Sequence, residues 1–140
     1  MRTIITNSEI ETKNLARDIA SKMDKNTVIV LSGELGAGKT KFVEGFLSYY
    51  GLENEISSPT FTIVNEYKNN QITIFHFDVY RLSDIDEFYA IGGEEYFSKG
   101  ICIIEWGEII EDAIPSNAIR INIEKDNEDF EKRIIKIKNL

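Results

Sequence analysis

The chain has 140 residues, of which 42% are hydrophobic and 23 are isoleucine, so we exclude a wholly disordered chain and expect one domain over residues 1–140. No apolar run approaches the ~18 residues that span a bilayer, and one cysteine cannot form an internal disulfide, so we expect a cytoplasmic protein without a membrane segment. Sixteen basic and 24 acidic residues give a net charge of −8, which disfavours direct binding to a nucleic-acid backbone.

The N-terminal segment predicts a strand followed by a capped helix. Residues 2–6 (RTIIT) have the composition of a short strand. Ser8 stands three residues before Glu11, which is the spacing of a capping box and indicates the start of a helix. The apolar face expected for this helix consists of Ile10, Ala16, Ile19, Ala20 and Met23.

A buried strand, a glycine-rich turn and a second helix follow. Residues 27–32 (TVIVLS) are a continuous apolar run, which is typical of a strand covered on both faces in a parallel sheet. Glycines at 33–38 predict a turn. An apolar stripe over Lys39–Tyr50 predicts a helix that ends at Gly51.

The middle of the chain predicts a hairpin and a short helix. Residues 61–67 and 71–78 have strand-like patterns, and Lys68-Asn69-Asn70 between them indicates the hairpin turn. Ser83 is the expected cap of a helix over 84–91, which two glycines interrupt.

The last third of the chain predicts a second buried strand and an antiparallel pair. Residues 101–104 are apolar throughout, and a short helix is expected over 107–113. Residues 119–123 and 134–138 alternate between polar and apolar across a turn at 126–127, which favours an antiparallel pair with one solvated face. Mixed strands and helices with one clear βα unit predict an α/β fold with a mixed, partly antiparallel sheet.

The segment 33–40 (GELGAGKT) matches the Walker A pattern G-x-x-x-x-G-K-[ST] in full, between a predicted strand and a predicted helix. Glycines let successive backbone N–H groups point inward around an anion, and the start of the helix adds partial positive charge. Lys39 can reach the β- and γ-phosphates, and the Thr40 hydroxyl can bind Mg²⁺. The motif therefore predicts a nucleotide site.

The sequence favours ATP as the nucleotide. It contains neither the Asn-Lys-x-Asp segment with which GTPases bind guanine nor their Asp-x-x-Gly switch. Small-molecule kinases close an arginine-bearing lid over the phosphates, but the five arginines here are scattered. A kinase is therefore an alternative, and so is a nucleotide-gated interaction module with negligible hydrolysis.

Three further segments occur in order after the Walker A motif: 58–64 (SPTFTIV), 76–82 (HFDVYRL) and 103–106 (IIEW). With this order and spacing, the chain resembles the TsaE family, also called YjeE, bacterial ATPases that support threonylcarbamoyladenosine modification of tRNA. The resemblance implies a three-layer P-loop NTPase-like fold with ATP and Mg²⁺ as cofactors. It also implies that the chain works with TsaB- and TsaD-like proteins and reaches tRNA only through that complex. We expect slow hydrolysis by the chain alone, because fast P-loop hydrolysis needs a cation at the developing charge and only Arg81 of the five arginines lies near a catalytic motif.

Two carboxylates stand at the ends of predicted apolar strands and are candidates for metal binding and for catalysis of ATP hydrolysis. Glu105 stands where a Walker B acid normally binds Mg²⁺ opposite Thr40, and Asp78 competes for the same role. The resemblance places Asp78 near the γ-phosphate, where hydrolysis requires it, so we expect catalysis from Asp78 and Lys39 and metal binding by Thr40 and Glu105. The expected nucleotide contacts are Glu34, Leu35, Gly36, Ala37, Gly38, Lys39, Thr40, Lys41, Thr60 and Asp78.

The remaining polar and aromatic positions, together with Cys102, have less specific interpretations. Thr60 occupies the position of a switch segment that senses the γ-phosphate, or it belongs to an ordinary proline-containing turn. His76 is interpreted as a structural histidine, and Arg81 either reaches a phosphate or pairs with an acid of the next helix. Trp106 is a partner anchor, a wall of the nucleotide site or a core residue, whereas Cys102 is interpreted as a small core residue.

Overall fold

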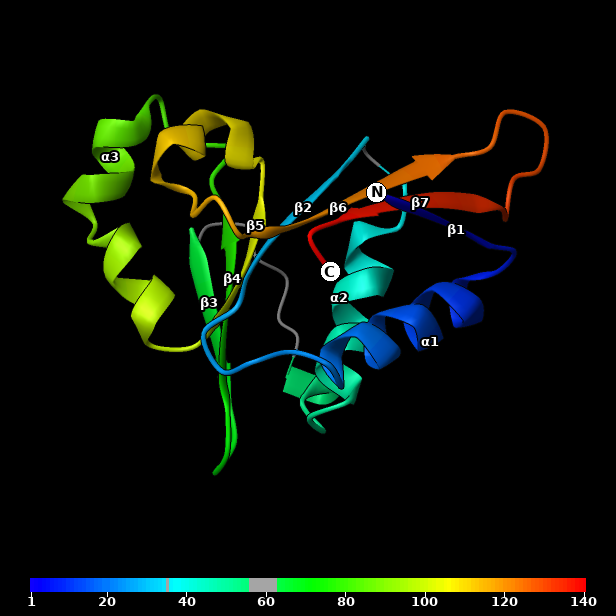
Figure 1. Cartoon of the computed structure of the whole chain (residues 1–140), viewed down its shortest axis with the longest axis horizontal. Coiled ribbons are helices and arrows are strands. Elements are labelled where there is room, and N and C mark those ends of the chain that lie inside the picture. The colour runs from blue at the N-terminus through cyan, green and yellow to red at the C-terminus, as the bar shows by residue number, and fades with distance from the viewer. Residues whose placement is uncertain (35, 56–62) are drawn as a thin grey trace.

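The computed structural model describes residues 1–34, 36–55 and 63–140, and its described strands form one seven-stranded sheet in the order β1-β7-β6-β2-β5-β4-β3 (Figure 1). The strands are β1 Arg2–Thr6, β2 Val28–Gly33, β3 Val64–Lys68, β4 Thr73–Asp78, β5 Ile101–Glu105, β6 Ile119–Lys125 and β7 Arg133–Lys138. The α-helices are α1 Glu9–Ala20, α2 Lys39–Ser48 and α3 Ile85–Ala90, and the 3₁₀ segments are η1 Glu53–Glu55, η2 Gly93–Ser98 and η3 Gly107–Ala113.

The centre of the sheet is parallel and its two sides are antiparallel. β2 pairs in parallel with β5 and with β6, and β4 pairs in parallel with β5. β3 is antiparallel to β4, and β7 is antiparallel to both β6 and β1. This confirms the predicted mixed, partly antiparallel sheet, including the antiparallel pair at the C-terminal end of the chain.

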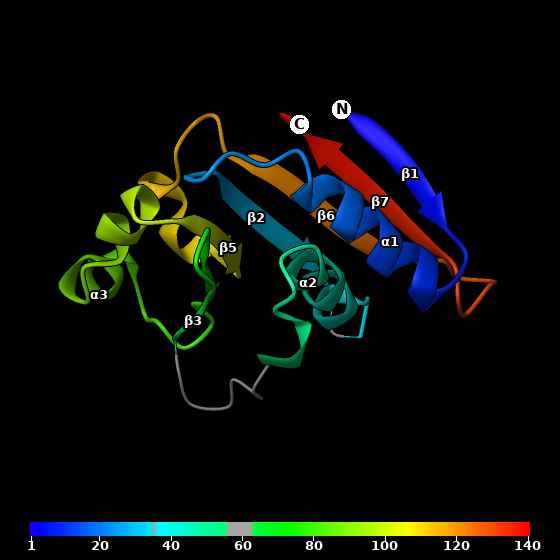
Figure 2. The same cartoon turned by 90° about the horizontal axis from the view of Figure 1, so that it is seen from below.

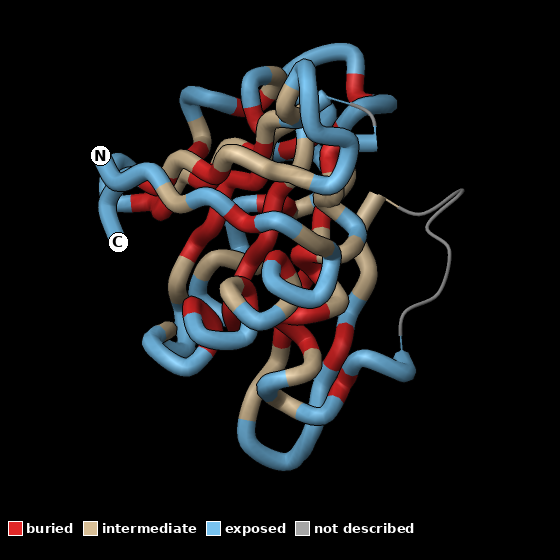
Figure 3. Tube along the Cα trace, turned by 90° about the vertical axis from the view of Figure 1, so that its right-hand side faces the viewer, coloured by how far each residue is buried: buried red, intermediate tan, exposed pale blue. Residues whose placement is uncertain are grey.

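Helices cover both faces of the central strands, which gives three layers (Figures 1 and 2). Alternate residues of a strand point to opposite faces, so each strand contributes to two separate clusters of buried side chains. One cluster lies under α1 and α2 and includes Ala16, Ile19, Ile29, Leu31, Phe42, Phe46, Ile74 and Ile103. The other lies under α3, η2 and η3 and includes Val30, Phe75, Phe77, Phe88, Cys102, Ile104 and Ile110. In Figure 3, where the chain is coloured by burial, the buried residues gather at the centre of the molecule.

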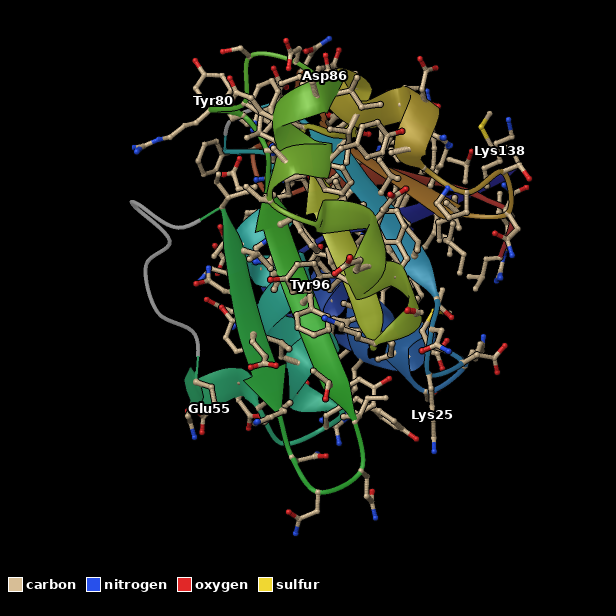
Figure 4. The ribbon with its side chains drawn as sticks, turned by 90° about the vertical axis from the view of Figure 1, so that its left-hand side faces the viewer. Lys25, Glu55, Tyr80, Asp86, Tyr96 and Lys138 are labelled. Carbon is tan, nitrogen blue, oxygen red and sulfur yellow. The ribbon has the colours of Figure 1, made fainter. Side chains whose placement is uncertain are left out.

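Aromatic side chains pack the second cluster. The ring centroid of Tyr96 lies 4.8 Å from that of Phe75 and 5.3 Å from that of Phe77, both edge-on. Figure 4 shows Tyr96 in front of the central strands on this face. Burial raises the pKa of the Cys102 thiol to about 12, which agrees with its interpretation as a core residue.

The structure corrects two local predictions and refines a third. Ile10 is 70% exposed and does not belong to the core face of α1. It stands two residues, about 200° around the helix, from the buried Thr12, so the core face turns away from it. Asp84, rather than Ser83, caps α3, because its side chain accepts a hydrogen bond from the Glu87 N–H. The short helix expected over residues 107–113 is present as a kinked 3₁₀ segment.

Within the described ranges 1–34, 36–55 and 63–140, no helix is both long and apolar enough to cross a membrane.

Candidate functional site

A cavity of about 690 Å³ opens where β2, β4 and β5 end. Asp78 and Glu105 are paired residues at the ends of β4 and β5, and Leu31 of β2 is the partner of Glu105 on its other side. Parallel strands that end together bring their last side chains to one edge of the sheet. The loop that follows β2 therefore lies beside both carboxylates.

The backbone of that loop depends on glycine. Gly33 has φ +151°, and a Cβ there would lie 2.5 Å from the Ile123 carbonyl oxygen of neighbouring β6. Gly36 and Gly38 have φ +80° and +108°, in the left-handed region that other residues rarely adopt. Gly38 is the N-cap of α2, and its carbonyl accepts the Phe42 N–H at 2.9 Å. The loop thus leads directly into the helix N-terminus, as the Walker A pattern predicts.

Three side chains of the cavity wall interact closely. His76 Nε2 lies 2.5 Å from one oxygen of Glu105, and Lys39 Nζ lies 3.6 Å from the other. The side chains of Lys39, Glu105 and His76 are only 12%, 13% and 11% exposed. Burial raises the pKa of Glu105, but the hydrogen bond with His76 and the charges of His76 and Lys39 outweigh it, so the pKa lies below its usual value. Glu105 is therefore held as a carboxylate, the form that binds a metal.

The aromatic ring of Trp106 borders the cavity beside Lys39. The Lys39 ammonium lies 5.0 Å from the centroid of the Trp106 ring, and the centroid of the Tyr80 ring lies 5.0 Å from that of Trp106. Trp106 has φ +63°, an uncommon backbone conformation for a bulky residue. Its exposure excludes the interpretation as a core residue. Figure 4 shows Tyr80 beyond the end of β4.

Asp78 is held differently from Glu105. One oxygen of its carboxylate accepts the Tyr80 N–H at 3.1 Å, which fixes the turn after β4. Its own backbone N–H donates to the Ile63 carbonyl at 2.8 Å. This arrangement leaves the carboxylate at the cavity surface together with the exposed Thr40.

Most of the predicted site residues meet at the cavity. Those that line it are Gly36, Gly38, Lys39, Thr40, Lys41, Asp78 and Glu105. Glu34 is exposed outside it, and Ala37 is fully buried, so its side chain faces the core. Leu35 and Thr60 lie outside the described residues. Arg81 is not among the lining residues.

Several lining residues did not emerge from the sequence. His76 was interpreted as structural, yet it lines the cavity and binds Glu105. Its spacing of two from Asp78 on one strand face was the available signal. Ile10, Phe130 and Arg133 come from the far end of the chain or from α1, and no local pattern distinguishes them. Arg133 Nε donates to the Ala37 carbonyl at 2.8 Å, across 96 positions of sequence.

The donors at the cavity fit Mg²⁺ together with a nucleotide, and not a metal held by the protein alone. In the part of the chain that the structure describes, no group of three or more His, Cys, Asp or Glu could hold a metal ion. Mg²⁺ usually takes one or two protein oxygens and completes its shell with phosphates and water. Thr40 and Glu105 can supply these oxygens, and the cavity volume suits a small-molecule ligand.

Comparisons with known proteins agree with this geometry. The family model described as "Threonylcarbamoyl adenosine biosynthesis protein TsaE" matches residues 6–135. A Rickettsia bellii protein named tRNA threonylcarbamoyladenosine biosynthesis protein TsaE is 41% identical over 136 residues, covering 96% of this chain and 93% of the relative. The Bacillus subtilis protein of the same name is 39% identical over 120 residues, covering 85% and 75%. The crystal structure of Bacillus subtilis YdiB matches with a TM-score of 0.76 at 34% identity, over 97% of this chain and 83% of that one, which confirms the P-loop fold.

Proposed function

The chain belongs to the TsaE family of tRNA threonylcarbamoyladenosine biosynthesis proteins, and from this premise we propose that residues 1–140 form one Mg²⁺-dependent ATPase domain. The domain acts in the cytoplasm within a complex with TsaB- and TsaD-like proteins. One observation supports the ATPase assignment most directly: the Walker A loop and the carboxylates of Asp78 and Glu105 border the same cavity.

The proposed roles follow from where the side chains lie. Lys39 holds the β- and γ-phosphates, and it exchanges one anionic partner, Glu105, for another when it does so. Thr40 and Glu105 hold Mg²⁺, which neutralises phosphate charge when bound. The Asp78 carboxylate accepts a hydrogen bond from the attacking water and so orients it. Leu35 and Thr60 remain proposed nucleotide contacts, together with Glu34 and the backbone of Ala37.

Slow hydrolysis by the isolated chain is part of the proposal. Fast phosphoryl transfer in P-loop proteins depends on a cation at the developing charge, and an arginine finger contributes about 10³- to 10⁵-fold. Arg133 is the one arginine among the described lining residues, and it is bound to the carbonyls of Ala37 and Phe130. We therefore assign the missing activation to a partner protein.

Phosphate release tests the proposal. The purified chain is assayed at saturating Mg·ATP alone, with TsaB- and TsaD-like proteins from the same organism, and with each partner separately. We expect a slow rate that increases in the full mixture. A high rate that no partner changes would overturn the partner dependence, and acceptor-dependent ADP release with a phosphorylated product would show a kinase. Equal support of tRNA modification by an Asp78→Ala variant would favour an interaction module.

A further inference from the structure

The phosphate loop has a lysine on each of its two sides. β2, which leads into the loop, lies between β5 and β6 (Figure 2). On the β5 side, the Lys39 ammonium lies beside Glu105. On the β6 side, Lys125 is the last residue of its strand, and a Cβ at Gly36 would lie only 3.2 Å from its ammonium nitrogen. Lys125 therefore approaches the loop from the side opposite to Glu105.

We propose that Lys125 is a second lysine, in addition to Lys39, that binds the phosphates of the nucleotide. The inference rests on the proposed function, because it requires a polyphosphate in the loop. An ammonium group is a compact charge with three donors on a flexible stem, so it binds phosphate oxygens without a fixed direction of approach. Lys125 is exposed, and its stem is free to turn from Gly36 toward a phosphate that the loop holds.

The cross-strand neighbour of Lys125 is also a cation. Lys125 and Arg133 are register partners in β6 and β7, and residues directly opposite each other in an antiparallel pair point to the same face. Arg133 Nε donates to the Ala37 carbonyl at 2.8 Å, so it adjoins the same loop. Like charges opposite each other destabilise a strand pair, and a nearby anion offsets that cost. A phosphate in the loop would be such an anion.

Acidic side chains of the protein do not take this place. Among the described residues, no ion pair includes Lys125 or Arg133. The acids on either side of Lys125 in the sequence have other partners. Lys136 donates to the Glu124 carboxylate at 3.2 Å, and the Asp126 carboxylate accepts two backbone N–H groups of its own turn, at 3.0 and 2.8 Å. The charge of Lys125 is thus available to a ligand.

The charge balance of the site explains why a second lysine is useful. The Lys39 ammonium lies 3.6 Å from an oxygen of Glu105, which is held as a carboxylate, so the two charges largely cancel. The chain as a whole carries a net charge of −8, which repels a polyphosphate. A cation in contact with the phosphates acts at short range, where salt screens it least. Lys125 adds such a cation.

Calorimetric titration with two ligands tests the proposal: Mg·ATP, and Mg·tripolyphosphate, which has phosphates and no base. Lys125→Met keeps most of the stem and removes the charge, so the affinity for both ligands should fall by about five- to tenfold. This loss should become smaller as the salt concentration rises, because the contact is exposed. Lys125→Arg keeps the charge and should recover most of the affinity for both ligands.

The matched control is Lys138→Met, which removes an exposed lysine at the other end of β7 and should change neither affinity. Unchanged affinities in Lys125→Met, a loss confined to ATP, or an equal loss in the control would overturn the proposal. A loss that Lys125→Arg shares and that salt does not change would also overturn it, because Lys125 would then only support Gly36. If the original chain bound neither ligand, the proposed nucleotide site itself would be wrong.

Discussion

The two ends of the cavity are built in opposite ways. At the end proposed to hold the phosphates and the metal, Lys39, His76 and Glu105 are nearly buried and lie on or beside strand ends, and Glu105 pairs with both of the others. At the other end, Ile10 and Phe130 are mostly exposed and stand outside the sheet. A group that takes part in phosphoryl transfer must be positioned within a fraction of an ångström, whereas an exposed apolar contact tolerates more freedom. We therefore expect turnover to depend more strongly on the first end than on the second.

The largest expected effect separates the two carboxylates at the metal end. In Asp78→Asn, turnover should fall by about 10²- to 10³-fold while Mg·ATP affinity stays near that of the original chain, because the loss falls on the transition state. Single-turnover hydrolysis and calorimetric binding measure the two quantities.

Glu105→Gln is the matched comparison, since Glu105 is the register partner of Asp78. It should mainly raise the Mg²⁺ concentration needed for half-maximal ATP binding. The reverse pattern, with Mg²⁺ dependence lost in Asp78→Asn and turnover alone lost in Glu105→Gln, would mean that the two roles are exchanged.

The second largest effect is expected from the loss of Lys39 in the Walker A loop. Lys39→Ala removes a charge-assisted contact to phosphate, so ATP and tripolyphosphate affinity should each fall by about 10- to 100-fold. Lys13→Ala is the control, because Lys13 pairs with Glu44 outside the cavity, and we expect it to bind both ligands normally. Equal affinities in the two variants would remove Lys39 from the site.

His76 should have an intermediate effect through Glu105. Loss of a side chain that hydrogen-bonds to a metal ligand commonly lowers metal affinity by about tenfold or more. His76→Ala should therefore raise the Mg²⁺ concentration needed for ATP binding by about that factor. His76→Gln retains a donor and should recover part of the loss, with ATP affinity at saturating Mg²⁺ unchanged in both. A Mg²⁺ requirement that neither variant alters would leave His76 with a purely structural role.

The smallest effect should come from the residue that joins the two ends. Arg133→Met keeps the aliphatic stem but removes the bonds to the carbonyls of Ala37, Phe130 and Lys132. Loss of these partly exposed hydrogen bonds predicts a decrease of about fivefold in ATP affinity. Because the phosphate loop itself loses a contact, the affinity for tripolyphosphate, which has phosphates and no base, should fall by a similar factor. A loss confined to ATP would show that Arg133 does not act through the loop.

Local patterns predicted the strand, loop and helix of the Walker A segment and the strand ends beside it. The strand, glycine loop and helix of the Walker A segment are contiguous, and the acids at 78 and 105 each end an apolar run, so short-range periodicity was sufficient. Because β4 and β5 are parallel, Asp78 and Glu105 at their ends then lie at the same edge of the sheet. The proposed roles of these residues still require the measurements above.

Ile10, Phe130 and Arg133 reach the cavity through contacts between segments that are distant in sequence, and short-range patterns do not predict such contacts. β7 lies between β1 and β6, so Arg133 reaches the phosphate loop only once the whole sheet has formed. Ile10 counted as a core residue because it is apolar and helical, although its angle around α1 points it away from the core. Phe130 follows an acidic turn and has no periodic neighbours that would mark it.

A crystal structure of the chain with Mg²⁺ and a non-hydrolysable ATP analogue tests the central claim most directly. The account predicts phosphates within the loop at 33–40, Lys39 on the phosphates, and Mg²⁺ at Thr40 and Glu105. A nucleotide bound elsewhere, or phosphates in the loop with Mg²⁺ away from both Thr40 and Glu105, would contradict it.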